Sequence, residues 1–153
     1  MQRKGDPLDK RLHRKVGADL FNYTWSLIDQ SRRSKETDDE MLHAAHASRY
    51  HWGHAGGPLN RSIGEWQISR VYAILHRAEP AFFHGRRALE IARRSHLAPF
   101  YVAYGYEALA RAASLAGKRR ERNQYFRAAQ RIGSRVRDSD DRRMLQQDLA
   151  TIP

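Results

Sequence analysis

Apolar residues recur every three or four positions along most of the chain, which is the spacing of one face of an α-helix. Leu20, Leu27 and Ile28 begin this recurrence, and no segment alternates between apolar and polar residues as a strand does. Polar breaks, prolines and glycines separate the periodic stretches. The pattern predicts an all-α chain with helices at about 18–33, 38–54, 59–76 (its start lying between 59 and 63), 80–94, 99–116, 119–136 and 139–149.

Helix starts are marked by two candidate capping boxes. Thr37 precedes Glu40 by three residues, and Ser62 precedes Glu65 by three. At this spacing the hydroxyl and the carboxylate each accept a hydrogen bond from a backbone N–H of the first turn. The linkers between the predicted helices are short, at most eight residues long. Consecutive helices are therefore expected to fold back on one another as antiparallel pairs.

A repeat is visible within these helices. Trp25, Trp66 and Glu107 are separated by steps of 41 residues and begin comparable short stretches. Alanines of the following helices keep the same step, at Ala47, Ala88 and Ala129. Two sets of landmarks with one period predict three helix-pair units, each of which buries its apolar face against its neighbours.

The middle unit, residues 62–95, carries the most specific pattern. Ser69 and Tyr72 stand before its turn, and Ala81, Gly85 and Ala88 follow on one face of the next helix. This order of small and aromatic residues resembles the tetratricopeptide (TPR) repeat, although the 41-residue step exceeds the family's usual 34. The resemblance implies a right-handed stack of about three antiparallel helix pairs with a C-terminal capping helix. It also implies a binding module, for which no catalysis is expected.

In TPR-like stacks the first helix of each pair lines a concave groove. By this resemblance the groove would have an aromatic floor with alternating charges. Its residues would be Trp25, Asp29, Trp66, Arg70, Tyr104, Glu107 and Arg111, together with Asn22 and Ile63. Arginine presents a planar fork suited to carboxylate or phosphate, and tryptophan supplies apolar anchorage. The expected ligand is therefore a protein or peptide segment, or a small molecule, that carries an acidic group.

The same charged residues have a structural interpretation. Arg70, Glu107 and Arg111 would then pair with one another between adjacent helices and brace the stack. Replacing both arginines with alanine separates the two interpretations. Loss of binding with an unchanged thermal midpoint favours a ligand site, whereas unfolding favours a brace.

A histidine cluster suggests a different kind of site. Two pairs stand three residues apart, where each pair presents its imidazoles on one helix face: His43 with His46, and His51 with His54. Two imidazoles are half of a zinc site, and the weak metal candidates His43 and His46 would need a remote third ligand such as Glu65 or His84. The His-Glu-x-x-His motif of metalloproteases is absent, because alanines separate the first pair. A metal-dependent enzyme built on His43 and His46 is thus a second alternative to the binding module. In the structural interpretation, these histidines bond to neighbouring residues at a helix interface.

The basic charge of the chain suggests nucleic-acid binding, the first alternative to a peptide-binding module. The chain carries a net charge of +11, and a basic balance favours nucleic acid as a partner. Four arginines would form a ridge on one helical face, at Arg120, Arg127, Arg131 and Arg135. A solvated helix face explains the same residues without a ligand.

The remaining features predict the domain organisation and the cellular location. Residues 1–16 are polar and basic and are predicted to form a flexible arm, followed by a single domain at 17–153. The chain has no cysteine, so disulfides and thiolate metal sites are excluded. No stretch is apolar enough for a membrane span or a signal peptide, so a cytoplasmic protein without a cofactor is expected. Phe100, Tyr101 and Val102 would serve either as core or as the contact of a homodimer.

Overall fold

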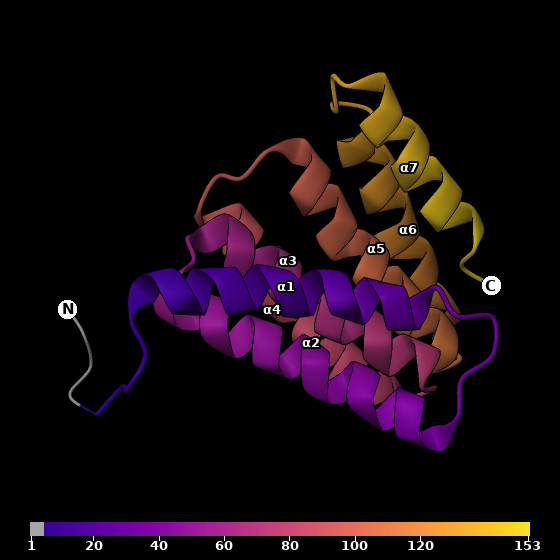
Figure 1. Ribbon diagram of the computed structural model, residues 1–153. Coiled ribbons are helices and arrows are strands. Elements are labelled where there is room, and N and C mark those ends of the chain that lie inside the picture. Colours follow the sequence, from indigo (N-terminus) through magenta and orange to yellow (C-terminus); the bar gives the residue numbers. More distant parts are fainter. Residues whose placement is uncertain (1–4) are drawn as a thin grey trace.

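A computed structural model describes residues 5–153, and within this range every regular element is an α-helix (Figure 1). The helices are α1 (Lys10–Ile28), α2 (Lys35–Ala55), α3 (Pro58–Ile74), α4 (Ala78–Arg94), α5 (Pro99–Leu115), α6 (Arg119–Gly133) and α7 (Ser139–Ala150). The prediction of an all-α chain is confirmed. None of these helices combines the length and the apolar character needed to cross a bilayer.

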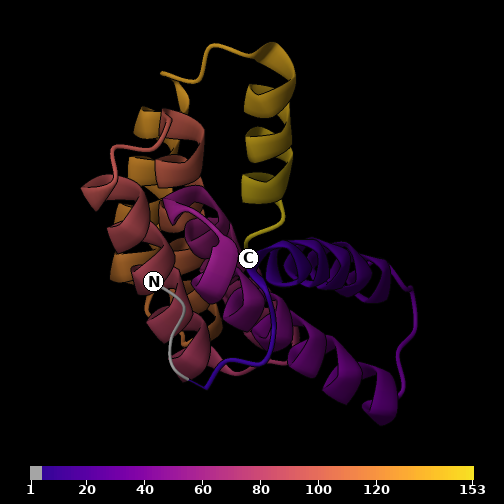
Figure 2. The same ribbon diagram turned by 60° about the vertical axis from the view of Figure 1, so that its left-hand side comes forward.

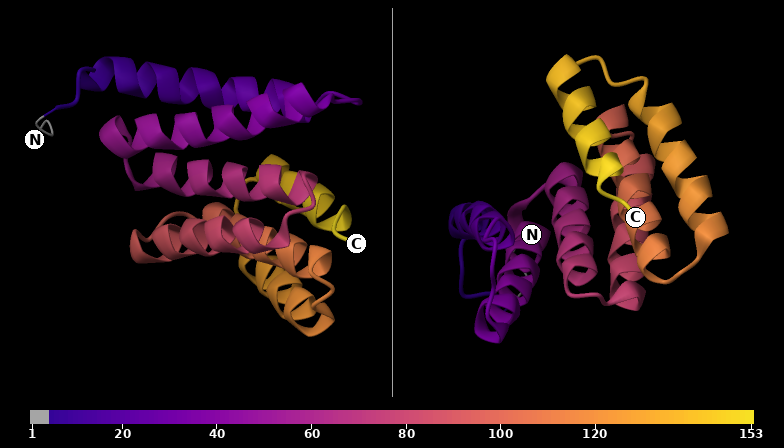
Figure 3. Two further views of the ribbon diagram at one scale, coloured as in Figure 1. Left: turned by 90° about the horizontal axis from the view of Figure 1, so that it is seen from below. Right: turned by 90° about the vertical axis from the view of Figure 1, so that its right-hand side faces the viewer.

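The helices pack in two series. In the first series, α1 lies along α2, α3 along α4 and α5 along α6 (Figure 3). These pairs are joined by contacts of α2 with α3 and of α4 with α5. In the second, contacts connect α1 with α3, α3 with α5 and α5 with α7. Side chains from α1, α3, α5 and α7, which are far apart in the sequence, therefore meet in one region of the molecule.

The turns that end α3 and α5 have the same backbone geometry. His76 and Gly117 both adopt positive φ, at 57° and 70°, and are 41 residues apart. The next residue in each turn, Arg77 or Lys118, donates its N–H to a carbonyl five residues back at 2.9 Å. This left-handed residue with its 6→1 hydrogen bond is the Schellman termination of a helix. The same termination ends α4, where His96 has a φ of 51° and the N–H of Leu97 donates to the carbonyl of Ala92 at 2.9 Å. This turn is therefore not confined to positions 41 residues apart.

Small residues allow α3, α4 and α5 to approach closely. The buried Ser69 hydroxyl on α3 donates to the carbonyl of Ala81 on α4 at 2.7 Å. A Cβ added to Gly85 would lie 3.3–3.4 Å from side-chain atoms of Ser69, Ala108 and Leu109. Small residues of the middle unit thus lie at close contacts between α3, α4 and α5.

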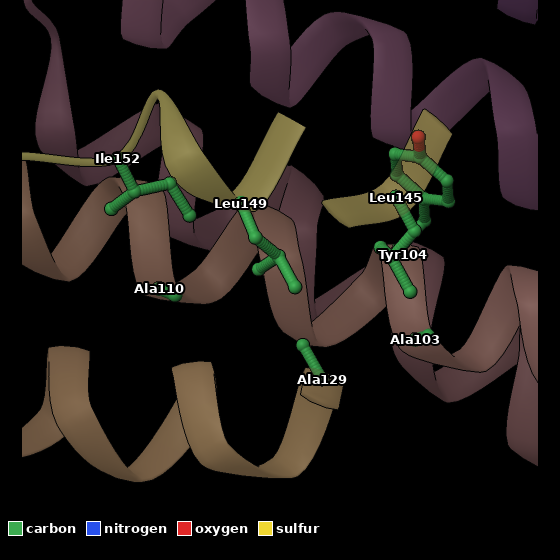
Figure 4. Packing of buried hydrophobic residues seen from close by; sticks show 7 residues of the cluster. All are labelled: Ala103, Tyr104, Ala110, Ala129, Leu145, Leu149 and Ile152. Carbon is green, nitrogen blue, oxygen red and sulfur yellow. The ribbon is translucent and has the colours of Figure 1, made fainter. Parts of the chain in front are cut away.

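The C-terminal helix is fixed by its apolar face. Leu145 and Leu149 on α7, followed by Ile152, are nearly inaccessible to solvent (Figure 4). They belong to a cluster with residues of α5 and α6, which includes Ala103, Tyr104, Ala110 and Ala129. Figure 2 shows that α7 and α1 diverge from each other. The position of α7 is fixed because its apolar side is buried against α5 and α6.

The two predicted capping boxes do not start helices. Ser34, not Thr37, caps α2, and its hydroxyl accepts the N–H of Thr37 at 3.2 Å. Ser62 and Glu65 are buried within α3, which begins at Pro58. The hydroxyl of Ser62 donates to a carbonyl of α4 at 3.0 Å, and Glu65 binds side chains described below. Their spacing matches a cap, but tertiary partners use the same polar atoms.

The first helix begins earlier than predicted, within the residues assigned to the N-terminal arm. Helix α1 begins at Lys10, capped by the Asp9 carboxylate, which accepts the N–H of Leu12 at 2.8 Å. His13 is only 1% exposed, although residues 10–16 show no apolar periodicity. The helix is held there by polar contacts to α2, which a hydrophobic pattern does not report. Residues 1–4 of the arm lie outside the described range.

Candidate functional site

An aromatic row follows α1, α3 and α5. The ring centroids of Trp25 and Trp66 are 5.6 Å apart, and those of Trp66 and Tyr104 are 5.3 Å apart. The tilted and edge-on arrangements are those that aromatic pairs prefer. Two of these residues are landmarks of the 41-residue repeat, so the repeat places them in direct contact.

The aromatic row opens onto a cavity of about 180 Å³. The cavity is lined mainly by apolar side chains of α1, α3, α5 and α7: Phe21, Trp25, Ser62, Ile63, Trp66, Ala88 (on α4), Phe100, Tyr101, Tyr104, Met144 and Asp148. Its volume is below the ~300–1,000 Å³ usual for small-molecule and cofactor sites. A single large apolar side chain suits this space better than a cofactor does.

Glu107 is the centre of a charged network beside this row. Its carboxylate is 1% exposed and accepts hydrogen bonds from the indole N–H of Trp66 at 3.1 Å and from Arg70 Nη1 at 3.1 Å. Arg111, one turn further along α5, donates to the same carboxylate through Nε at 2.8 Å and Nη2 at 2.6 Å. Two guanidinium groups therefore compensate one buried carboxylate.

Helix α7 supplies a second carboxylate. Asp148 accepts the hydroxyl proton of Tyr104 at 2.6 Å and a hydrogen bond from Arg70 Nη2 at 3.4 Å. Arg111 also donates to the carbonyl of Asp148 and to the hydroxyl of Thr151. Burial, followed by the hydrogen bond to Asp148, raises the pKa of Tyr104 far above its usual value. Tyr104 thus remains a hydroxyl donor and ties α5 to α7.

The predicted groove residues fall into three groups. Trp25, Trp66 and Tyr104, with Ile63, line the cavity. Arg70 on α3 and Arg111 on α5 both donate to Glu107 on α5, as the brace interpretation expects. Asp29 is exposed at the end of α1 and is not part of the cavity lining, and Asn22 is exposed as well.

Asp148 belongs to the candidate site but is absent from the residues that the sequence predicts for it. A signal for it exists, because Asp148 lies 41 residues after Glu107. The series Trp25, Trp66, Glu107 therefore continues into α7. The prediction of a C-terminal cap assigns no site residue to this helix.

A second polar centre lies between α2, α3 and α4. Glu65, 2% exposed, accepts hydrogen bonds from Arg49 Nε at 2.9 Å and Arg87 Nε at 3.0 Å on one oxygen, and from His84 Nδ1 at 2.7 Å on the other. Burial is the largest influence on the pKa of Glu65 and raises it. The hydrogen bonds from His84 and Arg87 and the charges of Arg49 and Arg87 outweigh burial and lower this pKa overall. Glu65 is therefore an ionised carboxylate that joins three helices.

The predicted metal candidates point elsewhere. His46 Nε2 lies 3.0 Å from the hydroxyl of Tyr72, and its ring is edge-on to His84. His43 is exposed on α2. Among residues 5–153, neither belongs to a group of three potential ligands. Glu65 and His84, the suggested remote partners, bind each other instead.

His46 is expected to make the stability depend on pH. Burial, followed by the charge of His84, lowers the pKa of His46 below 6.5. The unfolded chain then binds more protons just below pH 6.5, so the free energy of unfolding falls as the pH decreases through this range. Urea unfolding of the wild type and of His46→Gln between pH 5 and 8 measures the effect.

We expect a shallower dependence in His46→Gln than in the wild type. His43→Gln, on an exposed position of the same helix, is the matched control and should keep the wild-type slope. Equal slopes for the wild type and His46→Gln would show that His46 does not contribute.

The four arginines of the predicted basic ridge are all exposed: Arg120, Arg127, Arg131 and Arg135. Nucleic-acid binding through them stays a prediction. Phe100 and Tyr101 line the cavity, and they and Val102 are half-buried. A homodimer through these three residues likewise stays a prediction.

Comparison with protein families, with curated proteins and with solved structures finds no significant match.

Proposed function

We propose that the chain is a TPR-like binding module that holds a protein or peptide segment by inserting one of its large apolar side chains into the aromatic cavity. The observation that carries the proposal is the row Trp25–Trp66–Tyr104 along a cavity of about 180 Å³. Buried aromatic anchors of this kind dominate the energetics of protein interfaces.

Support for the TPR-like architecture comes from the repeat. The landmarks Trp25, Trp66, Glu107 and Asp148 lie on α1, α3, α5 and α7. Trp25 packs on Trp66 and Trp66 donates to Glu107, while Arg70 bonds to both Glu107 and Asp148. A right-handed stack of three antiparallel pairs, closed by α7 as the first helix of an incomplete fourth unit, accounts for these contacts.

The chemistry of the partner changes in one respect. Arg70 and Arg111 were expected to bind an acidic group of the ligand, but Glu107 and Asp148 already pair with them. An acidic group on the partner stays a prediction, and binding it at these arginines requires displacement of Asp148. The apolar side chain is therefore the part of the partner that the site favours most.

Panning a random 12-residue peptide library against the purified protein tests the proposal. Enriched peptides should share a large apolar side chain and should change the fluorescence of the cavity tryptophans. Trp25→Ala is expected to weaken their binding at least tenfold, as removal of a central aromatic anchor usually does. Met144→Arg, at a cavity-lining position of α7 that is 51% exposed, should weaken it as well.

Phe83→Ala is the matched control. Phe83 is an aromatic residue on α4 that is 55% exposed and does not line the cavity. Its replacement should leave the dissociation constants within about twofold of the wild type. Failure to enrich any peptide, or equal affinity of the wild type and both cavity variants, would contradict the proposed function. Circular dichroism establishes that each variant is folded.

A further inference from the structure

A cluster of polar side chains joins the segment before α1 to the C-terminal half of α2, away from the residues that line the aromatic cavity. Asp6 Oδ2 lies 3.0 Å from His13 Nε2 and 2.9 Å from His54 Nδ1. The other oxygen of Asp6 accepts the N–H of Leu8 at 3.1 Å, which fixes the carboxylate. His13 is 1% exposed and the side chain of His54 is 19% exposed.

We propose that Asp6, His13 and His54 bind one divalent transition-metal ion, with Zn²⁺ as the most suitable. One ligand atom from each residue lies within 4.8 Å of the other two. A tetrahedral ion with bonds of about 2.0–2.2 Å places its ligand atoms about 3.3–3.5 Å apart. The two contacts to Asp6 therefore need to lengthen by only a few tenths of an ångström to admit the ion. Two imidazoles and a carboxylate are zinc ligands, and the remaining coordination position is left to solvent.

His51 provides the support that a metal-binding histidine requires. Its Nδ1 lies 2.8 Å from Nδ1 of His13. When Nε2 of His13 binds the ion, Nδ1 carries the proton and donates it to His51, and this second hydrogen bond orients the ring. Without the ion, His13 donates from Nε2 to Asp6 and accepts from His51 at Nδ1. The contact between His13 and His51 is thus retained in both states.

One rearrangement accompanies binding. The rings of His13 and His54 are stacked, with centroids 4.6 Å apart and planes at 8°. An ion bound to both nitrogens lies near each ring plane, so one ring must turn out of the stack. His54 is the ring that turns, because it is the second-last residue of α2 and is partly open to solvent, whereas His13 is buried.

The test uses the full chain without a histidine tag, freed of metal by dialysis against a chelator. Competition with a chromophoric chelator measures the affinity for Zn²⁺ and its stoichiometry, and the absorption of bound Co²⁺ reports the coordination geometry. We expect one ion per chain, a tetrahedral Co²⁺ spectrum and a higher thermal midpoint with Zn²⁺. Asp6→Asn and His54→Gln should each lower the affinity at least tenfold.

His43→Gln is the matched control, since it removes an exposed imidazole from the same helix as His54. Its affinity should equal that of the wild type. Asp6→Asn and His54→Gln are preferred to a variant of the buried His13, because they are less able to prevent folding. A stoichiometry and affinity shared by the wild type, Asp6→Asn and His54→Gln would mean binding to other surface histidines and would overturn the proposal. Absence of competition by the wild type would overturn it as well.

Discussion

The double replacement Arg70→Ala/Arg111→Ala is expected to lower the free energy of unfolding by about 3–5 kcal/mol, the usual cost of breaking a buried ion pair by removing one side. Glu107 is 1% exposed, whereas the two arginines are 16% and 14% exposed. Without them the buried carboxylate retains only the indole N–H of Trp66. For a chain of this size the loss corresponds to a thermal midpoint lower by about 6–20 °C.

Two controls separate charge from packing. Arg94→Ala breaks an ion pair whose side chains are 80% and 53% exposed, and its effect should be within about 0.5 kcal/mol of zero. Adding Glu107→Met to the double variant removes the uncompensated charge and should restore part of the lost stability. An unchanged midpoint in the double variant would instead return these arginines to the role of ligand-binding residues.

Gly105→Ala is expected to destabilise the protein by about 1–3 kcal/mol, the range found for overpacked cores. A Cβ at Gly105 on α5 would lie 2.8 Å from both Cα and Cβ of Leu89 on α4. One of these atoms belongs to the backbone, so α4 and α5 must separate to admit the methyl group. This steric cost exceeds the gain of ~1 kcal/mol that alanine gives over glycine in a helix. Denaturant unfolding measures the change.

Gly53→Ala is the matched control for this prediction and should have the opposite sign. Gly53 is exposed on α2, and the nearest atom to an added Cβ is the guanidinium end of Arg49 at 3.0 Å. That end can move, so the helix propensity of alanine is expected to stabilise the protein by about 0.5–1 kcal/mol. If both variants destabilise to the same extent, close approach of α4 and α5 is not the cause.

Helix positions followed well from the sequence where apolar periodicity was strong. The predicted stretches 38–54 and 80–94 lie within α2 and α4, which run Lys35–Ala55 and Ala78–Arg94. The beginning of α1 was placed eight residues too late. Its first turns are fixed by Asp9 and His13 through hydrogen bonds to backbone and to α2, and such bonds leave no periodic trace in the sequence.

The candidate site was predicted in part. Trp25, Trp66 and Glu107, which are spaced by 41 residues, are neighbours in the structure, because Trp25 packs on Trp66 and Trp66 donates to Glu107. The choice between ligand binding and bracing was left open. It depends on whether a second carboxylate reaches the arginines, and the carboxylate of Asp148, 78 residues after Arg70, lies 3.4 Å from Arg70 Nη2.

The histidines illustrate the same limit. Spacing along α2 identified His43, His46, His51 and His54 as candidates, because residues three apart share a helix face. The packing between helices decided which of these histidines contacts polar side chains of other elements. His46 meets Tyr72 on α3, and His54 meets Asp6 and is stacked on His13. A pattern within one helix carries no information about the residues opposite it.

By itself the sequence determined that this protein is built from helices and predicted a 41-residue repeat, since both follow from local periodicity and from the positions of small and aromatic residues. Only the tertiary structure decided which charges are paired, where α7 lies and which polar side chains converge. Those outcomes depend on distances between side chains remote in the sequence, and a few ångströms distinguish an ion pair, a cavity and a set of metal ligands.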